Sequence, residues 1–527
     1  MLCFFMRNFF FILIYFLSEL AAHAQPVNVL ITDKHYPEEP SIHINPKNPA
    51  LIMVGVNISY MHLSVDSGNT WSETKMVSDY GVWGDPCILT DSAGDFCFLH
   101  LSNPLQGNWI DRIVFQKYDV DSAKWTVDSY MGLNGSKAQD KEWCVSNPDN
   151  NLLFTTWTEF DDYGSTDLAD SSRIMFSRSV DGGATWSQAM KINQVSGDCI
   201  DSDNTVEGAV PAIGPNGEVY VSWAGPAGIV FDRSLDSGNS WLQHDVFVDP
   251  MPTGWDYEIP GISRANGLPI TLCDVSGGPF HGRIYINWSD QRNGSHNTDI
   301  FVSYSQDGGN TWSAPIRVNT DTTQTHQFFT WMTIDPSTGW LYAVFYDRRN
   351  YTDNHTDVYL AISKNGGQTF ENHLISESPF LPNSNIFFGD YTNISALNGM
   401  VRPVWTRLHN DSLSVWTALI QIDSTGGFTG YSPFIQRDNF SEIEAFPNPS
   451  TGKIVFSWKL KSMTTFSIDI LDNAGKKIAS PIVNRTLPEG MYVEYFDASA
   501  YQLSSGIYYF QLISEGRILR VKKFIIQ

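Results

Sequence analysis

Acidic and aromatic residues stand next to each other at several places in the chain, in types that suit the cleavage of glycosidic bonds. Asp256, Tyr257 and Glu258 are consecutive, and Asp390 and Tyr391 form a second acid and tyrosine pair. Glycoside hydrolysis needs one carboxyl group that donates a proton and a second that acts as base or nucleophile, and tyrosine replaces the nucleophilic carboxylate in some hydrolases. These five residues are therefore the candidate catalytic set.

Arginine and aspartate recur together in two segments of matched sequence. Asp290 and Arg292 belong to WSDQRN, Asp347 and Arg349 belong to FYDRRN, and Arg407 follows a similar tryptophan. A guanidinium group donates a planar pair of hydrogen bonds, which suits a carboxylate or vicinal hydroxyl groups of a substrate. Residues two apart on a strand also share one face, so each pair could simply neutralise itself. Both interpretations stay open.

Further acids recur beside aromatic or glycine residues, and this recurrence also supports two interpretations. A structural role, in which each acid binds backbone groups, is favoured because the acids occur in most repeats. In a substrate role, Glu207 and Trp143 would bind sugar, and the rings of Trp83, Trp143 and Trp255 would stack on sugar faces. The recurring segments are WGDP (83–86), DKEW (140–143), EG (207–208), WDYE (255–258) and GDY (389–391).

Oxygen-bearing side chains alternate in the segment 197–204. Asp198, Asp201 and Asp203 are of the type that hard cations such as calcium accept, although the twelve-residue pattern of an EF-hand is incomplete. The segment is therefore either a calcium site or a polar surface loop. The chemistry expected of the chain requires no other cofactor.

The elements that position these residues follow from a repeated eight-residue pattern. An acid or asparagine accepts hydrogen bonds from the backbone that follows it, a glycine provides a left-handed turn, and an aromatic ring packs on neighbouring strands. The five copies are SVDSGNTW (64–71), SVDGGATW (179–186), SLDSGNSW (234–241), SQDGGNTW (305–312) and SKNGGQTF (363–370).

This pattern resembles the Asp box, or BNR repeat, of sialidase-like β-propellers. The resemblance implies an all-β propeller in which the boxes join the outer strands of the blades and point away from the central funnel. It also implies a sialidase-like glycoside hydrolase with its active site in that funnel. The chain departs from sialidases in its first blade, where the expected arginine is missing and residues 38–46 read EEPSIHINP.

The spacing of the repeats predicts the number of blades. Asp66 and Asp181 are about twice as far apart as the later copies, and a degenerate copy with Asp121 and Trp125 divides that gap. Residues 394–420 have the hairpins of a blade without the box. Seven blades over residues 36–424 are favoured, and six, the usual number in sialidases, is the alternative.

The two ends of the chain predict export. Residues 1–24 have the basic start, apolar run and Ala-His-Ala site of a signal peptide, and we assign the propeller to residues 25–435. Residues 444–527, with PNP at 447–449 and a basic, apolar end, are similar to the C-terminal sorting domain of type IX secretion substrates. That resemblance implies a small C-terminal β-sandwich, contact with the type IX machinery, and a secreted or cell-surface protein.

The net charge of the chain limits the classes of partner that it can bind. The chain has a formal net charge of −24, which excludes nucleic acid as a partner because phosphate binding needs a positive face. After the signal peptide, no apolar run is long enough to span a membrane. Two functions remain: a secreted sialidase-like glycoside hydrolase acting on glycan or polysaccharide, and a noncatalytic surface propeller that binds glycan or protein.

Overall fold

The computed structural model describes residues 26–429, 444–460, 464–472, 476–488, 490–501, 503–514 and 517–527. The chain divides into two compact units, residues 1–431 and 432–527. The predicted signal peptide lies outside the described residues.

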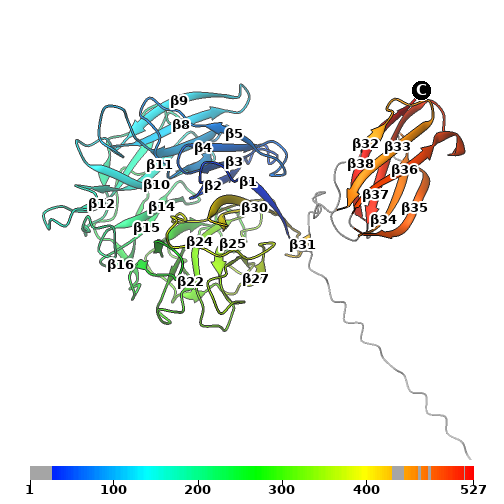
Figure 1. Cartoon of the computed structure of the whole chain (residues 1–527). Helices are drawn as coiled ribbons and strands as arrows, with labels where there is room; N and C mark the ends of the chain where they lie inside the picture. Colours follow the sequence, from blue (N-terminus) through cyan, green and yellow to red (C-terminus); the bar gives the residue numbers. More distant parts are fainter. Residues whose placement is uncertain are drawn as a thin grey trace, which may run out of the picture. The chain divides into compact units, whose positions relative to one another are not determined.

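Seven antiparallel sheets follow one another along the first unit (Figure 1). Blade 1 comprises β2 (Ser41–Ile44), β3 (Ile52–Val56), β4 (Tyr60–Ser64) and β5 (Ser72–Lys75), and blade 2 comprises β6 (Cys87–Thr90), β7 (Phe96–Leu101), β8 (Ile113–Asp119) and β9 (Lys124–Met131). Blade 3 comprises β10 (Ala138–Ser146), β11 (Leu153–Phe160), β12 (Ser172–Ser179) and β13 (Met190–Lys191), and blade 4 comprises β14 (Glu207–Ile213), β15 (Val219–Gly225), β16 (Gly228–Ser234) and β17 (Val246–Asp249). Blade 5 comprises β20 (Ile270–Cys273), β21 (Ile284–Asp290), β22 (Asp299–Ser305) and β23 (Ile316–Arg317), and blade 6 comprises β24 (Gln327–Ile334), β25 (Leu341–Asp347), β26 (Asp357–Ser363) and β27 (Glu371–Leu374).

The sheets close into a ring. The first strand of each sheet contacts the first strand of the next, and β28 (Asn393–Leu397) of blade 7 returns to contact β2 of blade 1. Radial repetition of this kind covers the edges of the sheets and leaves a channel along the central axis. The predicted all-β propeller is confirmed, with seven blades.

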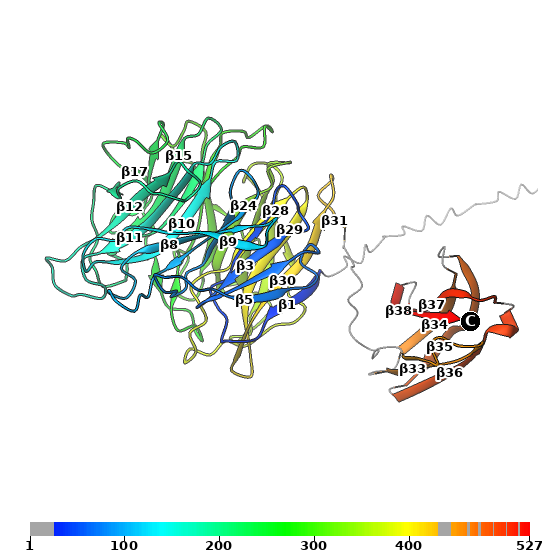
Figure 2. The same cartoon turned by 90° about the horizontal axis from the view of Figure 1, so that it is seen from above.

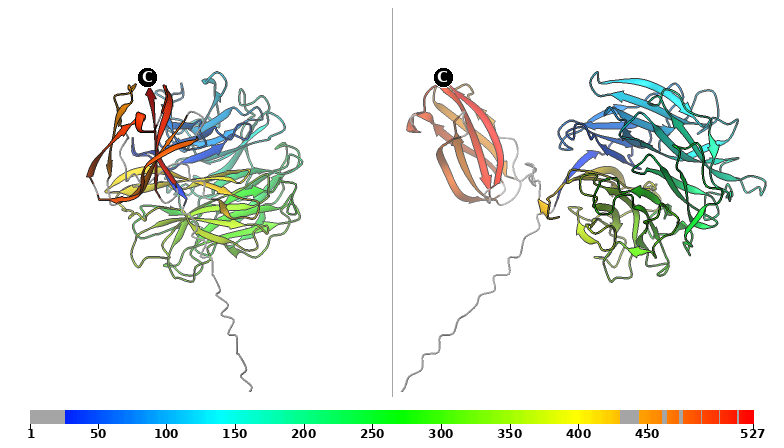
Figure 3. Two further views of the ribbon diagram at one scale, coloured as in Figure 1. Left: turned by 90° about the vertical axis from the view of Figure 1, so that its right-hand side faces the viewer. Right: turned by 180° about the vertical axis from the view of Figure 1, so that it is seen from behind.

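Blade 7 is assembled from both ends of the propeller. It pairs β28, β29 (Met400–His409) and β30 (Ser412–Ile422) with the N-terminal strand β1 (Val27–Thr32), and the short β31 (Phe428–Thr429) also pairs with β30 (Figures 2 and 3). Val27 lies opposite Leu419 in this ladder. The predicted blades began at residue 36, so the sequence analysis missed the strand that closes the ring.

Each of the five repeated turns connects the third and fourth strands of its blade. In blade 5, Asp307 accepts hydrogen bonds from the Ser305 hydroxyl at 2.8 Å and from the backbone N–H and hydroxyl of Thr311 at 2.9 and 2.6 Å. The Ser305 hydroxyl in turn accepts a bond from the Gly309 N–H at 2.8 Å. The side chains thus replace the backbone ladder at the point where the strand ends.

The ring of each of three repeated turns packs on the preceding blade. Trp241 lies 4.9 Å from the ring of Phe176 in β12, and Trp312 lies 5.1 Å from Phe231 in β16. Arg178 of blade 3 also donates hydrogen bonds of 2.6 Å to the turn of blade 4. The repeated turns therefore hold neighbouring blades together as well as closing their own.

We expect Asp307→Ala to lower the free energy of unfolding by about 1 kcal/mol, because three hydrogen bonds of an exposed turn are lost. Asp307→Asn is the matched control, since the turn of blade 6 already carries Asn365 and keeps an acceptor at that position. Urea unfolding measures both. Equal losses in the two variants would contradict the assignment of the turn's stability to these bonds.

The second unit is a β-sandwich. One sheet comprises β32 (Glu444–Phe446), β33 (Lys453–Leu460) and β36 (Gly490–Asp497), and the other comprises β35 (Lys477–Leu487), β34 (Thr464–Leu471), β37 (Gly506–Ser514) and β38 (Arg517–Ile526). A single 3-10 turn, η1 (Ala498–Tyr501), follows β36. Phe456 stacks on Phe510 at 4.0 Å and contacts Phe524 at 5.3 Å in its core. The predicted C-terminal β-sandwich is confirmed, and within the described residues no helix is long and apolar enough to cross a membrane.

Candidate functional site

The recurring acids stand where the inner strands begin, and an irregularity repeats there. The pairing of β10 with β11 shifts register between Asp140 and Trp143, and that of β14 with β15 shifts between Glu207 and Val210. Lys141 within the first bulge has a positive φ of 53°. A bulge places an extra residue in one strand and redirects its side chains. The recurrence in the sequence therefore marks a repeated bulge at one end of the channel.

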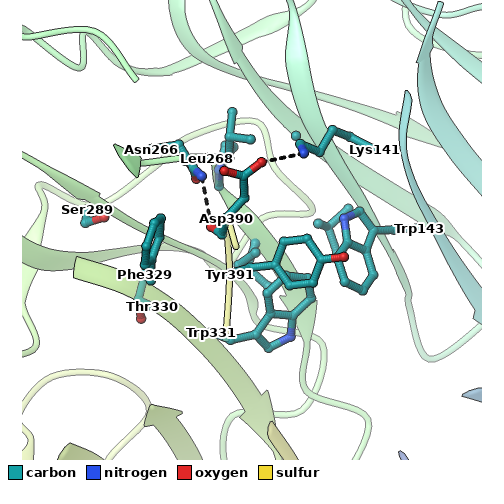
Figure 4. Close-up of a pocket in the computed structure, with 14 residues that line it drawn as sticks. Lys141, Trp143, Asn266, Leu268, Ser289, Phe329, Thr330, Trp331, Asp390 and Tyr391 are labelled. Carbon is teal, nitrogen blue, oxygen red and sulfur yellow. Dashed lines mark hydrogen bonds and ion pairs between the residues drawn. The ribbon is translucent and has the colours of Figure 1, made fainter. Parts of the chain in front are cut away.

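Asp390 is the buried centre of the acids at this end. Its carboxylate lies 2.7 Å from the Lys141 ammonium (Figure 4). Arg264 donates to the same carboxylate through Nε at 2.9 Å and through Nη2. The Asn266 side chain donates to the Asp390 carbonyl at 2.9 Å. Arg264 and Asn266 come from the hairpin of β18 (Asp256–Tyr257) and β19 (Ala265–Asn266), which lies between blades 4 and 5. Two cations thus hold one carboxylate.

Acids of the first two blades approach Asp390 from the other side. Glu39 accepts a hydrogen bond from the Asp390 backbone N–H at 3.1 Å, and the Asn57 amide donates to Glu38 at 3.3 Å and to Glu39. The Asp85 carboxylate lies 3.7 Å from the same Lys141 ammonium that binds Asp390. Residues far apart in the sequence therefore share one charged site.

Asp201 extends the site toward blades 3 and 4. It accepts a hydrogen bond from the Tyr163 hydroxyl at 2.7 Å and lies 3.2 Å from Arg264. The carboxyl group of Glu207 is buried beside Asp201, and the carboxyl oxygens of Glu142 are buried without a hydrogen-bond partner. We use the name acid cluster for Glu38, Glu39, Asp85, Asp140, Glu142, Asp201, Glu207 and Asp390.

The carboxyl groups of the acid cluster are held in opposite protonation states. Burial, reinforced by the Asp85 carboxylate, raises the pKa of Glu38 to about 8, and burial raises that of Asp140 to about 8 despite Lys141. Burial raises the pKa of Glu142 well above its ordinary value. Burial also acts on Asp390, but Lys141 and Arg264 outweigh it and hold its pKa well below the usual range. A proton donor and an ionised carboxylate therefore coexist at neutral pH.

The protonated acids predict a pH dependence of stability. Because the folded state keeps protons on Glu38 and Asp140 that the unfolded chain releases near pH 4, stability falls as pH rises toward 8. Buried histidines such as His43 and His100, with pKa values lowered to about 4, oppose this fall only up to about pH 6.5. We therefore expect the melting temperature to fall between pH 6.5 and 8, and Asp140→Asn to flatten that fall. A melting temperature that is constant or rises over this range would contradict the assignment.

Aromatic rings close the channel beside Asp390. Trp143 and Trp331 lie 4.2 Å apart, and Tyr391 lies 5.4 Å from Trp143 (Figure 4). The cavity between them and the neighbouring inner strands has a volume of about 30 Å³, which is room for about two water molecules. A group as large as a sugar ring therefore does not fit between these rings.

The expected stacking role of Trp143 and Trp255 is wrong, because both rings are buried. Trp143 has 8% of its surface exposed and belongs to the group that closes the channel. Trp255 has 4% exposed and donates to the Thr205 carbonyl at 3.1 Å. Trp83 is 38% exposed, so its ring remains open to a ligand.

The candidate catalytic set is only partly brought together. Asp390 and Tyr391 lie in the site, and Asp256 is exposed at its edge, where its backbone donates to Asp203. Tyr257 instead points into the core and hydrogen bonds to the Ser289 hydroxyl at 2.7 Å. Glu258 is exposed, with a carbonyl bound by the Gln291 amide.

The three arginines predicted to bind substrate contact residues of the propeller instead. Arg292 pairs with Asp290 at 2.5 Å and with Asp249 of β17 at 2.6 Å. Arg349 pairs with Asp347 at 2.5 Å and donates to Asn372 of β27. Arg407 donates to Ser378. The structure places Asp290 and Asp347 in these intrablade pairs, and none of the contacts found for the three arginines joins one to another.

The three candidate metal ligands point to separate partners. Asp198 accepts a hydrogen bond from the Thr205 hydroxyl at 2.8 Å, and Asp201 accepts one from the Tyr163 hydroxyl. Asp203 accepts a hydrogen bond from the Asp256 backbone N–H at 2.9 Å. Among the residues that the structure describes, no group of three or more His, Cys, Asp or Glu side chains is arranged to hold a metal ion. The segment is built as a polar loop, in which Asp201 serves the acid cluster.

Several residues of the site escaped the sequence analysis. Glu38 and Glu39 stand in the stretch where the resemblance to sialidases predicts an arginine. The missing arginine was the only sign in the sequence that this stretch differs. Lys141 was visible only as part of a recurring acidic segment. Arg264 lies in a hairpin outside the repeats, and no pattern identifies it.

A larger hollow of about 280 Å³ lies at blade 4, away from the channel. Most of its lining is apolar, and Gln194, His244 and Asp245 are its polar members. The acid cluster does not contribute to it. Of the acid cluster, Asp390 lines the smaller cavity, beside Lys141 and Tyr391.

The comparisons with known proteins identify the second unit. Residues 444–527 match the family model described as "Secretion system C-terminal sorting domain". The chain carries a type IX sorting domain. The protein is therefore one that leaves the cell, to the cell surface or the medium. A search of curated proteins finds no match.

Solved structures resemble the propeller at low identity. They include a Hadza microbial sialidase (12% identity, 70% of this chain and 73% of that chain, TM-score 0.39) and the α-L-arabinanase of Penicillium chrysogenum complexed with arabinobiose (12%, 75% and 98%, TM-score 0.39). A polysaccharide lyase of family 25, an ulvan lyase, is also similar (13%, 75% and 96%, TM-score 0.45). Likeness at this level concerns the fold alone.

Proposed function

We propose that the protein is a secreted glycoside hydrolase whose active site is the acid cluster at the mouth of the propeller channel. The observation that carries this proposal is that two acids meet Lys141: Asp85 lies 3.7 Å from its ammonium, and Asp140, whose pKa is raised to about 8, accepts its backbone N–H at 2.9 Å. Glycosidic bonds are cleaved by one carboxylic acid and one carboxylate acting together. Export by the sorting domain brings such a site to glycans outside the cell.

Each residue has a distinct role in this proposal. Asp140, whose pKa lies near 8, donates a proton to the leaving oxygen at neutral pH. Asp85 acts as the base or nucleophile. Asp390 is too strongly held as an anion to exchange protons, so it acts as a positioning residue that fixes Lys141 and Arg264.

A noncatalytic glycan-binding propeller is the second candidate. The observation that favours it is the small cavity, because Trp143, Trp331 and Tyr391 leave room only for water below the mouth. Recognition would then occur on the outer surface of the mouth, and the acids would orient hydroxyl groups without breaking a bond.

The test is hydrolysis of a panel of polysaccharides and chromogenic glycosides by the secreted protein. We expect turnover by the wild type, with Asp140→Asn and Asp85→Asn each lowering kcat at least a hundredfold. Glu371→Gln, at an exposed position in β27, is the matched control and should leave kcat unchanged. Absence of turnover by a folded wild type across the panel would favour the second candidate.

A further inference from the structure

Large aromatic rings lie open to solvent around the mouth of the channel. Trp83, Trp109 and Phe387 are 38, 44 and 40% exposed. The rings of Trp83 and Trp109 meet edge to face at 5.9 Å, and Trp109 meets Tyr163 in the same way at 5.7 Å. Such contacts fix the rings in place while leaving parts of their surface free. Exposed aromatic groups in fixed positions are a common feature of binding surfaces.

These rings border the acid cluster. Trp83 is two residues before Asp85, and the Tyr163 hydroxyl donates to Asp201 at 2.7 Å. The Arg264 guanidinium lies 5.3 Å from the centre of the Phe387 ring. We use the name aromatic rim for Trp83, Trp109, Tyr163 and Phe387. The rim thus carries apolar surface directly above carboxyl groups.

The charges at the mouth determine which ligands suit the rim. Lys141 and Arg264, the two cations that contact the acid cluster, are both bound to Asp390. A ligand carboxylate or sulfate would have to displace Asp390 and would also be repelled by Asp85 and Asp201. Hydroxyl groups, in contrast, can both accept from protonated carboxyls such as Glu207 and donate to ionised ones.

Glu142 points to a ligand independently of the rim. Its carboxyl group is more than nine-tenths buried and has no hydrogen-bond partner. A buried polar group without a partner is costly, and a bound water or hydroxyl group would satisfy it.

We infer that the aromatic rim stacks the faces of an uncharged sugar chain, whose hydroxyl groups reach the acid cluster below. This inference rests on the proposed function, because it names the substrate class of the same site. It excludes sialosides and other acidic glycans as ligands. The rings supply most of the contact, and the carboxyl groups set the orientation.

The test is native affinity electrophoresis of the full secreted chain in gels that contain one polysaccharide each. The neutral probes are arabinan and hydroxyethylcellulose, and the anionic probes are alginate and polysialic acid. We expect retardation by a neutral probe and none by the anionic ones. Trp109→Ala should weaken binding about tenfold, and Trp109→Phe should keep most of it. Phe247→Ala, which removes a 58% exposed ring from β17, is the matched control and should change nothing.

The outcomes separate this inference from the proposed function. Binding of a neutral probe that depends on Trp109, without any turnover, supports the rim and overturns the hydrolase. Turnover or binding that is unchanged in Trp109→Ala and Trp83→Ala, or retardation by the anionic probes alone, overturns the rim. Unchanged near-ultraviolet circular dichroism confirms that each variant is folded, and Trp83→Ala supplies the test if Trp109→Ala is not folded.

Discussion

Lys141→Met should lower the free energy of unfolding of the propeller by about 3–5 kcal/mol. The Lys141 ammonium lies 2.7 Å from Asp390 and 3.7 Å from Asp85, and its side chain is only 10% exposed. Without it, two buried carboxylates of the acid cluster lose their shared cation. Urea unfolding of the full chain, followed by tryptophan fluorescence, measures the loss.

Two further variants show whether the pair itself carries the effect. Lys141→Met combined with Asp390→Asn should recover at least half of the lost stability, because the uncompensated charge is removed as well. Lys364→Met removes the half-buried partner of the exposed Glu371 and should cost at most about 1 kcal/mol. If Lys141→Met unfolds at the wild-type urea concentration, Lys141 does not hold the site.

Gly238→Ala should lower the free energy of unfolding by about 2–4 kcal/mol. Gly238 belongs to the repeated turn of blade 4 and has a φ of +81°. A Cβ atom at this position would lie 2.3 Å from Phe176 of blade 3, whose ring is 1% exposed and has no room to move. The substitution therefore pushes two blades apart.

Gly164→Ala is the matched control for this clash. Gly164 has a similar φ of +77°, but a Cβ atom there meets no other atom within 4 Å. It should cost only the backbone strain of about 1 kcal/mol. Equal losses at the two positions, measured by thermal unfolding, would show that contact between the blades contributes little.

The repeats made the architecture predictable, because each copy encodes a local turn. The side chains of a turn such as that of Asp307 bind their own backbone within a few residues, so spacing alone gave the blades and their number. The closing strand β1 was missed for the opposite reason. Its partner is β30, at the far end of the propeller, and six residues carry no pattern that specifies such a distant pairing.

The site was only partly predictable for the same physical reason. Acids at the starts of the inner strands were visible as a recurrence, yet whether Asp140 and Asp390 both come near Lys141 depends on the ring closing. The matched Asp and Arg segments attracted a functional interpretation, but Arg292 and Arg349 mainly bind carboxylates within the propeller. When a blade repeats, its structural ion pairs repeat with it. In the sequence, such a repetition cannot be distinguished from a set of functional residues.

Blade 7 forms only when both ends of the propeller sequence are present. Strand β1 is made first, while its partner β30 comes from the last part of the domain to be synthesised. A chain cut short before β30 leaves β1 with a free edge, and such an edge invites pairing with other chains. Only a chain that reaches the end of β30 can close the ring. Outside the cell, where cytoplasmic chaperones do not act, this pairing distinguishes a complete propeller from a truncated one.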